Sequence, residues 1–157
     1  MPERILTTQS PPPAPWDVAA PHVVDMTVQC DHIDHMGHVN NAVYLQFMEQ
    51  TAWAHTRALG LTWASYQELD AACVVRRHEL DYLAAAFAGD QVQVATWISG
   101  NDGRLNLWRG YQIRRVDGGK MLLRGHTHFV CVRLSNGRPR RMPQAFIDAY
   151  QPVESLP

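Results

Sequence analysis

The hydrophobic pattern first predicts one long helix. From Asn41 to Leu59 the sequence NAVYLQFMEQTAWAHTRAL lacks proline and glycine, and its apolar residues do not keep to one narrow stripe. This pattern predicts a helix of about 27 Å that neighbouring elements enclose on most sides. Asn40 or Asn41 can cap its start, and Gly60 suits the left-handed residue that follows its end. We therefore expect a largely buried central helix.

The apolar period changes from helical spacing to two after residue 70, which is typical of half-buried strands. Strands are predicted at 23–28, 72–82, 90–99, 104–116 and 120–134. Asp117-Gly118-Gly119 has the composition of a hairpin turn, and a short helix is predicted over 143–150. Strands joined by tight turns predict an antiparallel sheet with the long helix on its face, which is an α+β fold.

The composition indicates where the folded domain begins and argues against several classes of partner. Residues 1–23 are rich in proline and poor in branched apolar side chains, so we expect a flexible arm there and a folded domain over 24–157. The net charge of −1 in 157 residues provides no positive field that would attract nucleic acid. No apolar run is long enough for a membrane-spanning helix, so we expect neither a nucleic-acid nor a membrane partner. The start of the chain lacks the apolar segment of a secretory signal.

Cysteine usage and motif searches narrow the chemistry. Cys30, Cys73 and Cys131 are scattered and form no CxxC pair, so we expect neither a disulfide framework nor a cysteine metal site. This usage favours a reducing compartment, and we expect a cytoplasmic protein. The chain contains no G-x-S-x-G, G-x-G-x-x-G or G-x-x-x-x-G-K-[ST] motif, which argues against a serine hydrolase, a dinucleotide enzyme and a phosphoryl transferase.

The segment CDHIDHMGHVNNAVYLQFMEQ is the most specific part of the sequence. It contains an acidic residue, Asp34, then the run Gly37 to Asn41, then an aromatic-rich helix carrying Tyr44 and Glu49. In this pattern the chain resembles the hot-dog-fold acyl-CoA thioesterases, specifically the 4-hydroxybenzoyl-CoA thioesterase-like branch. The resemblance extends over about 24–149, through Gly89-Asp90 and the late GRPRRMP. One departure is His32, at a position where many relatives carry a second acid.

The resemblance implies a fold, an activity and an assembly. The expected fold is a hot-dog domain, in which a five-stranded antiparallel sheet wraps a long helix, paired into a homodimer and further into a homotetramer. The implied reaction is hydrolysis of an acyl-CoA thioester to a carboxylate and free CoA, with no cofactor and no metal. The exposed edges of such a sheet favour pairing independently of the resemblance.

The resemblance also assigns roles to residues of the loop and the helix. Asp34 would activate water or attack directly, the amide of Asn41 would polarise the thioester carbonyl, and His38 would orient the loop. The remaining expected substrate contacts are Gly37, Asn40, Tyr44, Phe47 and Met48. Guanidinium groups suit the phosphates of CoA, and the candidates for that contact are Arg104, Arg138, Arg140 and Arg141. The residues themselves agree, because free amides at a helix start form an anion site beside the loop carboxylate.

Several alternatives stay open at this stage. Asp34 could be an ordinary turn residue, and Glu49 could be either a catalytic or water-holding acid or a structural one that bonds to loop amides across a dimer. His32, His35 and His38 recur every three residues, but no regular element is expected to bring their rings together on a metal. The same pocket could serve a non-catalytic acyl-thioester binding module. A dehydratase or hydratase is disfavoured, because Gly37 and not proline precedes His38.

Overall fold

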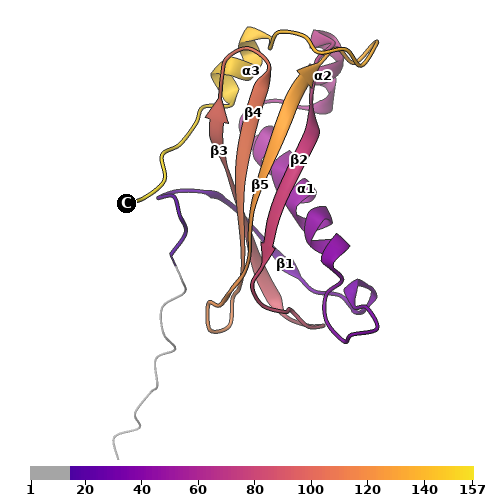
Figure 1. Cartoon of the computed structure of the whole chain (residues 1–157), viewed down its shortest axis with the longest axis vertical. Helices are drawn as coiled ribbons and strands as arrows, with labels where there is room; N and C mark the ends of the chain where they lie inside the picture. The colour runs from indigo at the N-terminus through magenta and orange to yellow at the C-terminus, as the bar shows by residue number, and fades with distance from the viewer. Residues whose placement is uncertain (1–14) are drawn as a thin grey trace, which may run out of the picture.

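The computed structural model describes residues 15–157, and Figure 1 shows their arrangement. The strands are β1 (His22–Thr27), β2 (Ala72–Tyr82), β3 (Gln91–Asn101), β4 (Asn106–Arg115) and β5 (Met121–Val132). The helices are α1 (Asn41–Ala58), α2 (Trp63–Leu69) and α3 (Gln144–Ala149), together with the 3-10 turn η1 (Cys30–His32). None of the helices in this described part is long and apolar enough to cross a membrane.

The five strands form one antiparallel sheet in the order β1-β3-β4-β5-β2, and α1 lies along one face of it (Figure 1). The turn between β4 and β5 contains Gly118 and Gly119 at φ of 74° and 67°, a conformation that a side chain disfavours. Strands β1 and β2 are the two edges of the sheet. This architecture confirms the predicted α+β hot-dog fold.

Helix α1 begins where the sequence predicts, but only one of its faces is buried. The side chain of Asn40 accepts a hydrogen bond from the Ala42 amide at 3.0 Å and caps the start. Gly60 follows the end at φ 91°. The opposite face, which includes Gln46, Glu49 and Gln50, is exposed, so the expectation of enclosure on most sides is wrong for a single chain. Pairs of polar residues alternate with pairs of apolar residues along α1. The number of apolar residues alone therefore did not show that they gather on one face.

Helix α2 was not predicted, because residues 62–70 carry no clear apolar period. Thr62 and Ser65 cap its start reciprocally, each side chain accepting the backbone amide of the other at 3.2 Å and 3.0 Å. Tyr66 is its one buried residue. Capping and a single aromatic anchor therefore define this short helix.

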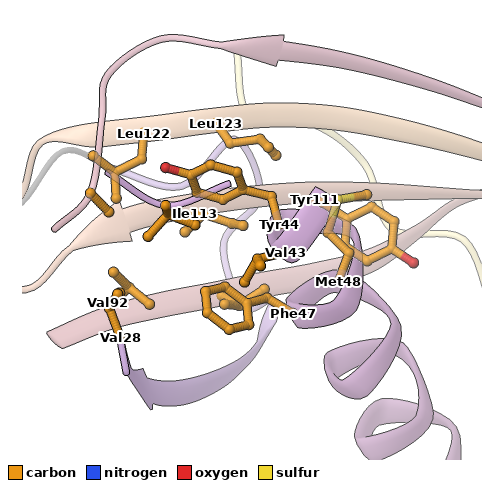
Figure 2. Close-up of a cluster of buried hydrophobic side chains, with 13 residues drawn as sticks. Val28, Val43, Tyr44, Phe47, Met48, Val92, Tyr111, Ile113, Leu122 and Leu123 are labelled. Atoms are coloured by element: carbon orange, nitrogen blue, oxygen red, sulfur yellow. The ribbon is translucent and has the colours of Figure 1, made fainter. Parts of the chain in front are cut away.

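The core contains two clusters of apolar side chains on the α1 side of the sheet. Figure 2 shows the first, in which Tyr44 and Phe47 of α1 pack among Val92 of β3, Ile113 of β4 and Leu123 of β5. The second lies at the other end of the sheet, and there α2 and α3 close the core. Its largest members are Tyr66, Ile98, Leu107, Phe146 and Tyr150.

The opposite, outer face of the sheet is partly covered by the start of the described chain. Val18 is 2% exposed and packs with Trp16 against Ala95 and Trp97 of β3. The Arg114 guanidinium lies 3.8 Å from the centre of the Trp16 ring. The expected flexible arm over 1–23 is therefore wrong from residue 15 onward, because these apolar side chains cover the sheet. Residues 1–14 of that arm lie outside the described residues.

Candidate active site

The loop that carries the predicted acid forms a tight turn closed by its own backbone. The Asp34 amide donates to the His38 carbonyl, and the Gly37 amide donates to the Asp34 carbonyl, both at 3.1 Å. The Asp34 carboxylate accepts the Met36 amide at 2.8 Å. Gly37 has a φ of 81°, so this position of the turn requires glycine-like freedom. The turn therefore fixes the carboxylate while leaving one of its oxygens free of bonds within the described chain.

The start of α1 follows this turn directly. The Val39 amide donates to Ala86 at 2.9 Å, which ties the loop to the segment between β2 and β3. Within residues 15–157 the Asn41 amide has no hydrogen-bond acceptor, and the Tyr82 hydroxyl donates to the Asn41 carbonyl at 3.3 Å. A groove of about 200 Å³ runs here and is lined by His38, Val39, Asn41, Tyr44, Tyr82, Leu83, Ala84 and Ala85. A helix N-terminus with a free amide at a groove favours a negatively charged oxygen.

His32 makes two local contacts in the loop. Its Nδ1 accepts the Gln29 amide at 2.9 Å, and its ring stands edge-on to Phe47 with the ring centres 5.1 Å apart. His35 is exposed. In the described part of the chain, no three or more His, Cys, Asp or Glu side chains come together as metal ligands.

The predicted substrate contacts fall into two groups, one in the exposed turn and one in the core. Gly37 and Asn40 lie in the exposed turn, whereas Tyr44, Phe47 and Met48 are at most 3% exposed and belong to the core. Tyr44 still borders the groove beside Asn41. Burial raises the pKa of the Tyr44 phenol, so it remains protonated at neutral pH. Phe47 shapes the core beneath the loop and borders neither the groove nor the larger cavity described next.

A larger cavity of about 340 Å³ lies further along α1 between the helix and the sheet. Met48, Glu49 and Trp53 of α1 border it, and Leu107, Arg109 and Tyr111 of β4 line the sheet side. Glu49 is exposed at its rim and makes no hydrogen bond or ion pair within residues 15–157. Asn41 borders the groove and Glu49 borders this cavity, and the two positions are about 12 Å apart along the helix axis.

Arg109, which belongs to none of the sequence motifs, is 2% exposed. Its guanidinium donates to His55 Nδ1 at 2.8 Å, to Thr96 Oγ1 at 3.3 Å and to Thr56 Oγ1 at 3.5 Å. The signal was available, because Leu107, Tyr111 and Ile113 share one strand face and Arg109 occupies the missing position in that series. An arginine in phase with core residues points inward.

The groups around Arg109 are held neutral. Burial, with a contribution from the Arg109 charge, lowers the pKa of His55 to about 4. Burial also lowers the pKa of His78, whose Nδ1 lies 2.7 Å from the Thr127 hydroxyl. Tyr150 bonds to Thr56 and to the Tyr66 hydroxyl, and burial raises the pKa of both phenols. Among the described residues that line this cavity, Arg109 is consequently the one with a formal positive charge at neutral pH.

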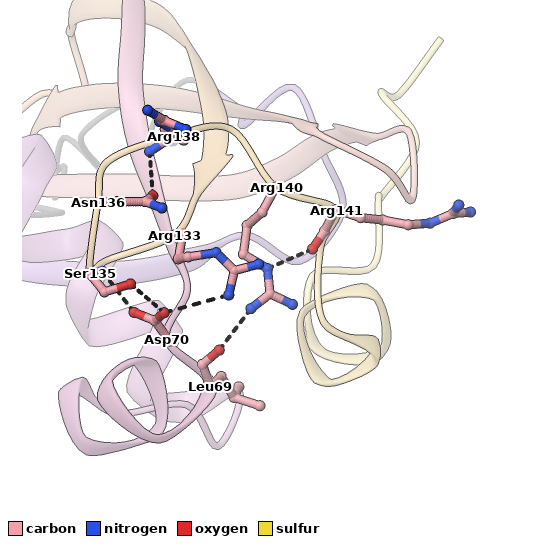
Figure 3. Close-up of polar contacts among 8 residues, drawn as sticks. All are labelled: Leu69, Asp70, Arg133, Ser135, Asn136, Arg138, Arg140 and Arg141. Atoms are coloured by element: carbon pink, nitrogen blue, oxygen red, sulfur yellow. Dashed lines mark hydrogen bonds and ion pairs between the residues drawn. The ribbon is translucent and has the colours of Figure 1, made fainter.

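The turn before β4 and the segment after β5, which carry the four candidate CoA arginines, lie at the opposite end of the sheet from the loop that precedes α1 (Figure 1). Figure 3 shows the Arg140 guanidinium donating to the carbonyls of Leu69 and Arg141, and the Arg141 side chain extending away from the chain. The Arg138 amide is held by Asn136 at 3.0 Å, and Arg104 is exposed in the turn before β4. Helix α1, about 27 Å long, lies between these residues and the loop, and their contact with CoA stays a prediction.

The helix, the sheet order and the loop geometry define a hot-dog domain. The sequence profile of the thioesterase-like superfamily matches residues 28–150, and the chain belongs to this superfamily. No curated protein sequence matches the chain.

Solved structures share the fold. The 1,4-dihydroxy-2-naphthoyl-CoA thioesterase Slr0204 from Synechocystis superposes with a TM-score of 0.75 at 21% identity, over 83% of this chain and 96% of the other. The hypothetical protein SAV2348 from Staphylococcus aureus, solved in complex with CoA, gives 0.77 at 18% identity, over 92% and 94%. The DHNA-CoA thioesterase from Staphylococcus aureus gives 0.73 at 22% identity, over 82% and 87%.

Proposed function

We propose that the protein is a hydrolase that cleaves an acyl-CoA thioester to a carboxylate and free CoA. The observation that carries this proposal is the turn at Asp34, which fixes a carboxylate in the loop that leads into α1, whose first residue, Asn41, has a free amide. Thioester hydrolysis needs a base or nucleophile near the carbonyl carbon and a donor for the oxyanion. Membership of the thioesterase-like superfamily supports the same reaction.

In the proposed reaction the thioester carbonyl oxygen accepts the Asn41 amide. Asp34 either takes a proton from a water that attacks the carbonyl carbon or attacks that carbon itself, forming an anhydride that water then opens. The carbon–sulfur bond breaks, and the CoA thiolate leaves and is protonated. Gly37 and Asn40 shape the turn, and His38 borders the groove where the thioester would lie. No step of this scheme uses a metal or a cofactor besides the CoA of the substrate.

We propose a homodimer, and a homotetramer built from it, as the working form in the cytoplasm. The edge strand β2 leaves Val74 and Val75 43% and 49% exposed, which favours pairing with a second copy. Since Arg104, Arg138, Arg140 and Arg141 lie far from Asp34 of their own subunit, any contact of theirs with CoA at that loop would come from another subunit. All three cysteines are free, in agreement with a reducing compartment.

Release of free thiol from short, medium, long and aromatic acyl-CoAs tests the proposal. Asp34→Asn should keep the fold and lose about 10²- to 10⁴-fold in kcat, because the amide is nearly isosteric but neither takes a proton nor attacks the carbonyl. Glu49→Gln is the matched control on the helix. Loss of rate in the Asp34 variant together with unchanged substrate affinity would support the loop carboxylate.

Two other outcomes would change the assignment. Full turnover in Asp34→Asn with collapse in Glu49→Gln would move the chemistry from the loop to the rim of the larger cavity. Binding of acyl-CoA without thiol release from any member of the panel would identify a binding module and contradict a hydrolase.

A further inference from the structure

The buried layer around Arg109 contains a positive charge without an opposite charge. The three hydrogen-bond partners of its guanidinium are a neutral imidazole and two hydroxyls, and its Nε has no partner in the described chain. None of the ion pairs among residues 15–157 involves Arg109. Burying an unpaired charge is costly, so such an arginine is retained at the expense of stability.

Arg109 also borders the larger cavity, which gives its charge access to a ligand. Among residues 15–157, Glu49 is the only acid that lines this cavity, and it is exposed and makes no ion pair with Arg109. The rest of the lining is mainly apolar, and Met48, Trp53, Leu107 and Phe129 supply much of it. An apolar cavity with one convergent charged group is the typical form of a small-molecule site.

We propose that Arg109 binds a carboxylate at the far end of the acyl group, so that the substrates are acyl thioesters carrying a second, terminal acid. This inference rests on the proposed function and names its substrate class, with the acyl chain running along α1 from the groove at Asn41 into the cavity that Arg109 borders. A carboxylate would supply the missing counter-charge and accept from the guanidinium, a strong type of hydrogen bond. A phosphate of CoA fits less well, because the cavity is lined mainly by apolar side chains.

The position of Arg109 also constrains the length of the substrate. The α1 residues that line the cavity run from Leu45, one turn after Asn41, to Thr56, a span of about 17 Å along the helix. Arg109 bonds to Thr56 at the distant end of that span. An acyl group whose thioester lies near the start of α1 therefore needs an extended chain to reach the guanidinium, and short diacids should gain nothing from it.

The test compares pairs of acyl-CoAs that differ only in the terminal group. Each member of a series from hexanedioyl-CoA to hexadecanedioyl-CoA is measured against the plain acyl-CoA of the same length. We expect a preference in kcat/KM of about 10- to 100-fold for the diacid, confined to the longer chains, since one charge-assisted hydrogen bond is worth about that much. No preference at any length would overturn the proposal.

The variants are Arg109→Met, which keeps the length without the charge, and Arg57→Gln, which removes an exposed arginine of α1. Arg109→Met should abolish the preference for the diacid, whereas Arg57→Gln should retain it. The melting temperature of each variant shows whether it is folded at the temperature of the assay. A preference that persists in Arg109→Met would contradict the proposal.

Equilibrium binding separates this inference from the proposed reaction. Calorimetric titration of hexadecanedioyl-CoA and palmitoyl-CoA into Asp34→Asn protein, with and without Arg109→Met, measures selectivity without turnover. If the wild type hydrolyses no acyl-CoA but the diacid binds more tightly only when Arg109 is present, the reaction is wrong and the Arg109 site stands. If hydrolysis proceeds but neither binding nor rate responds to the terminal acid, the proposed reaction stands and the Arg109 site is wrong.

Discussion

Arg109 of β4 donates a hydrogen bond of 2.8 Å to Nδ1 of His55, in the last turns of α1. Arginine has only donors to offer, so His55 accepts through an unprotonated nitrogen, in agreement with its low pKa of about 4. The contact joins the helix to the centre of the sheet through two basic side chains, and it persists only while the imidazole is neutral.

The first prediction concerns stability in mild acid. His55 has a pKa of about 6.5 when unfolded and about 4 when folded, so below pH 6.5 the unfolded state binds a proton that the folded state does not. The free energy of unfolding should therefore fall as pH decreases from 6.5 to 4. Allowing for partial solvent screening, the contribution of His55 is on the order of 2 kcal/mol. Urea unfolding at a series of pH values measures this slope.

His55→Gln is the control for that slope. The amide oxygen of glutamine can accept the Arg109 hydrogen bond but does not titrate. The variant should lose less stability than the wild type between pH 6.5 and 4. Since the pKa of His22 and of His78 is also lowered, a residual slope is expected. Identical slopes in the two proteins would contradict the assignment to His55.

The second prediction concerns the chain before β1. Deleting residues 1–20 removes Trp16 and Val18 from the outer face of the sheet and should lower the free energy of unfolding by about 3 kcal/mol or more. Deleting residues 1–14 should change it little, because that part of the sequence is rich in proline and has few branched side chains. Comparing the melting temperatures of the two truncations measures how much residues 15–20 contribute to stability. Equal melting temperatures would show that Trp16 and Val18 contribute nothing.

The sequence predicted the elements that follow from local period and turn chemistry. The strands, the Asn40 cap and the turn at Gly118 all lie where alternation and turn residues place them. The order β1-β3-β4-β5-β2 depends on long-range pairing, which no local pattern encodes. Trp16 and Val18 were assigned to a flexible arm because the prolines around them dominate the composition, whereas only the folded sheet provides the surface that they cover.

The candidate site also contains some residues that a local pattern identifies and others that come together only in the folded chain. Asp34, Gly37 and Asn41 are contiguous, so a motif could identify them together. Arg109 and His55 are separated by 54 positions and meet only because α1 crosses β4. The inward position of Arg109 could be read from the alternation of β4, but its partners could not. The roles of Asp34, Glu49 and the four candidate CoA arginines remain predictions.

The third prediction concerns Gly110, whose missing side chain makes room for an indole. A Cβ on Gly110 would lie 2.4 Å from the ring of Trp97 on the neighbouring strand. Gly110→Ala should therefore destabilise the protein by about 1–3 kcal/mol through overpacking, as measured by thermal unfolding. The same change in a Trp97→Leu background should cost clearly less. A cost that is equal in both backgrounds would show that the indole is not the cause.

The last prediction concerns assembly through the β2 edge. Light scattering at micromolar concentration should show a dimer or tetramer, because β2 is unpaired along one side and exposes Val74 and Val75 there. Val74→Lys should shift the distribution toward smaller species, because a lysine on an edge strand opposes pairing. Val116→Lys is the matched control, since Val116 is also about half exposed but follows β4. A wild-type monomer with full activity would contradict both the pairing and any contribution of a second subunit's arginines to CoA binding.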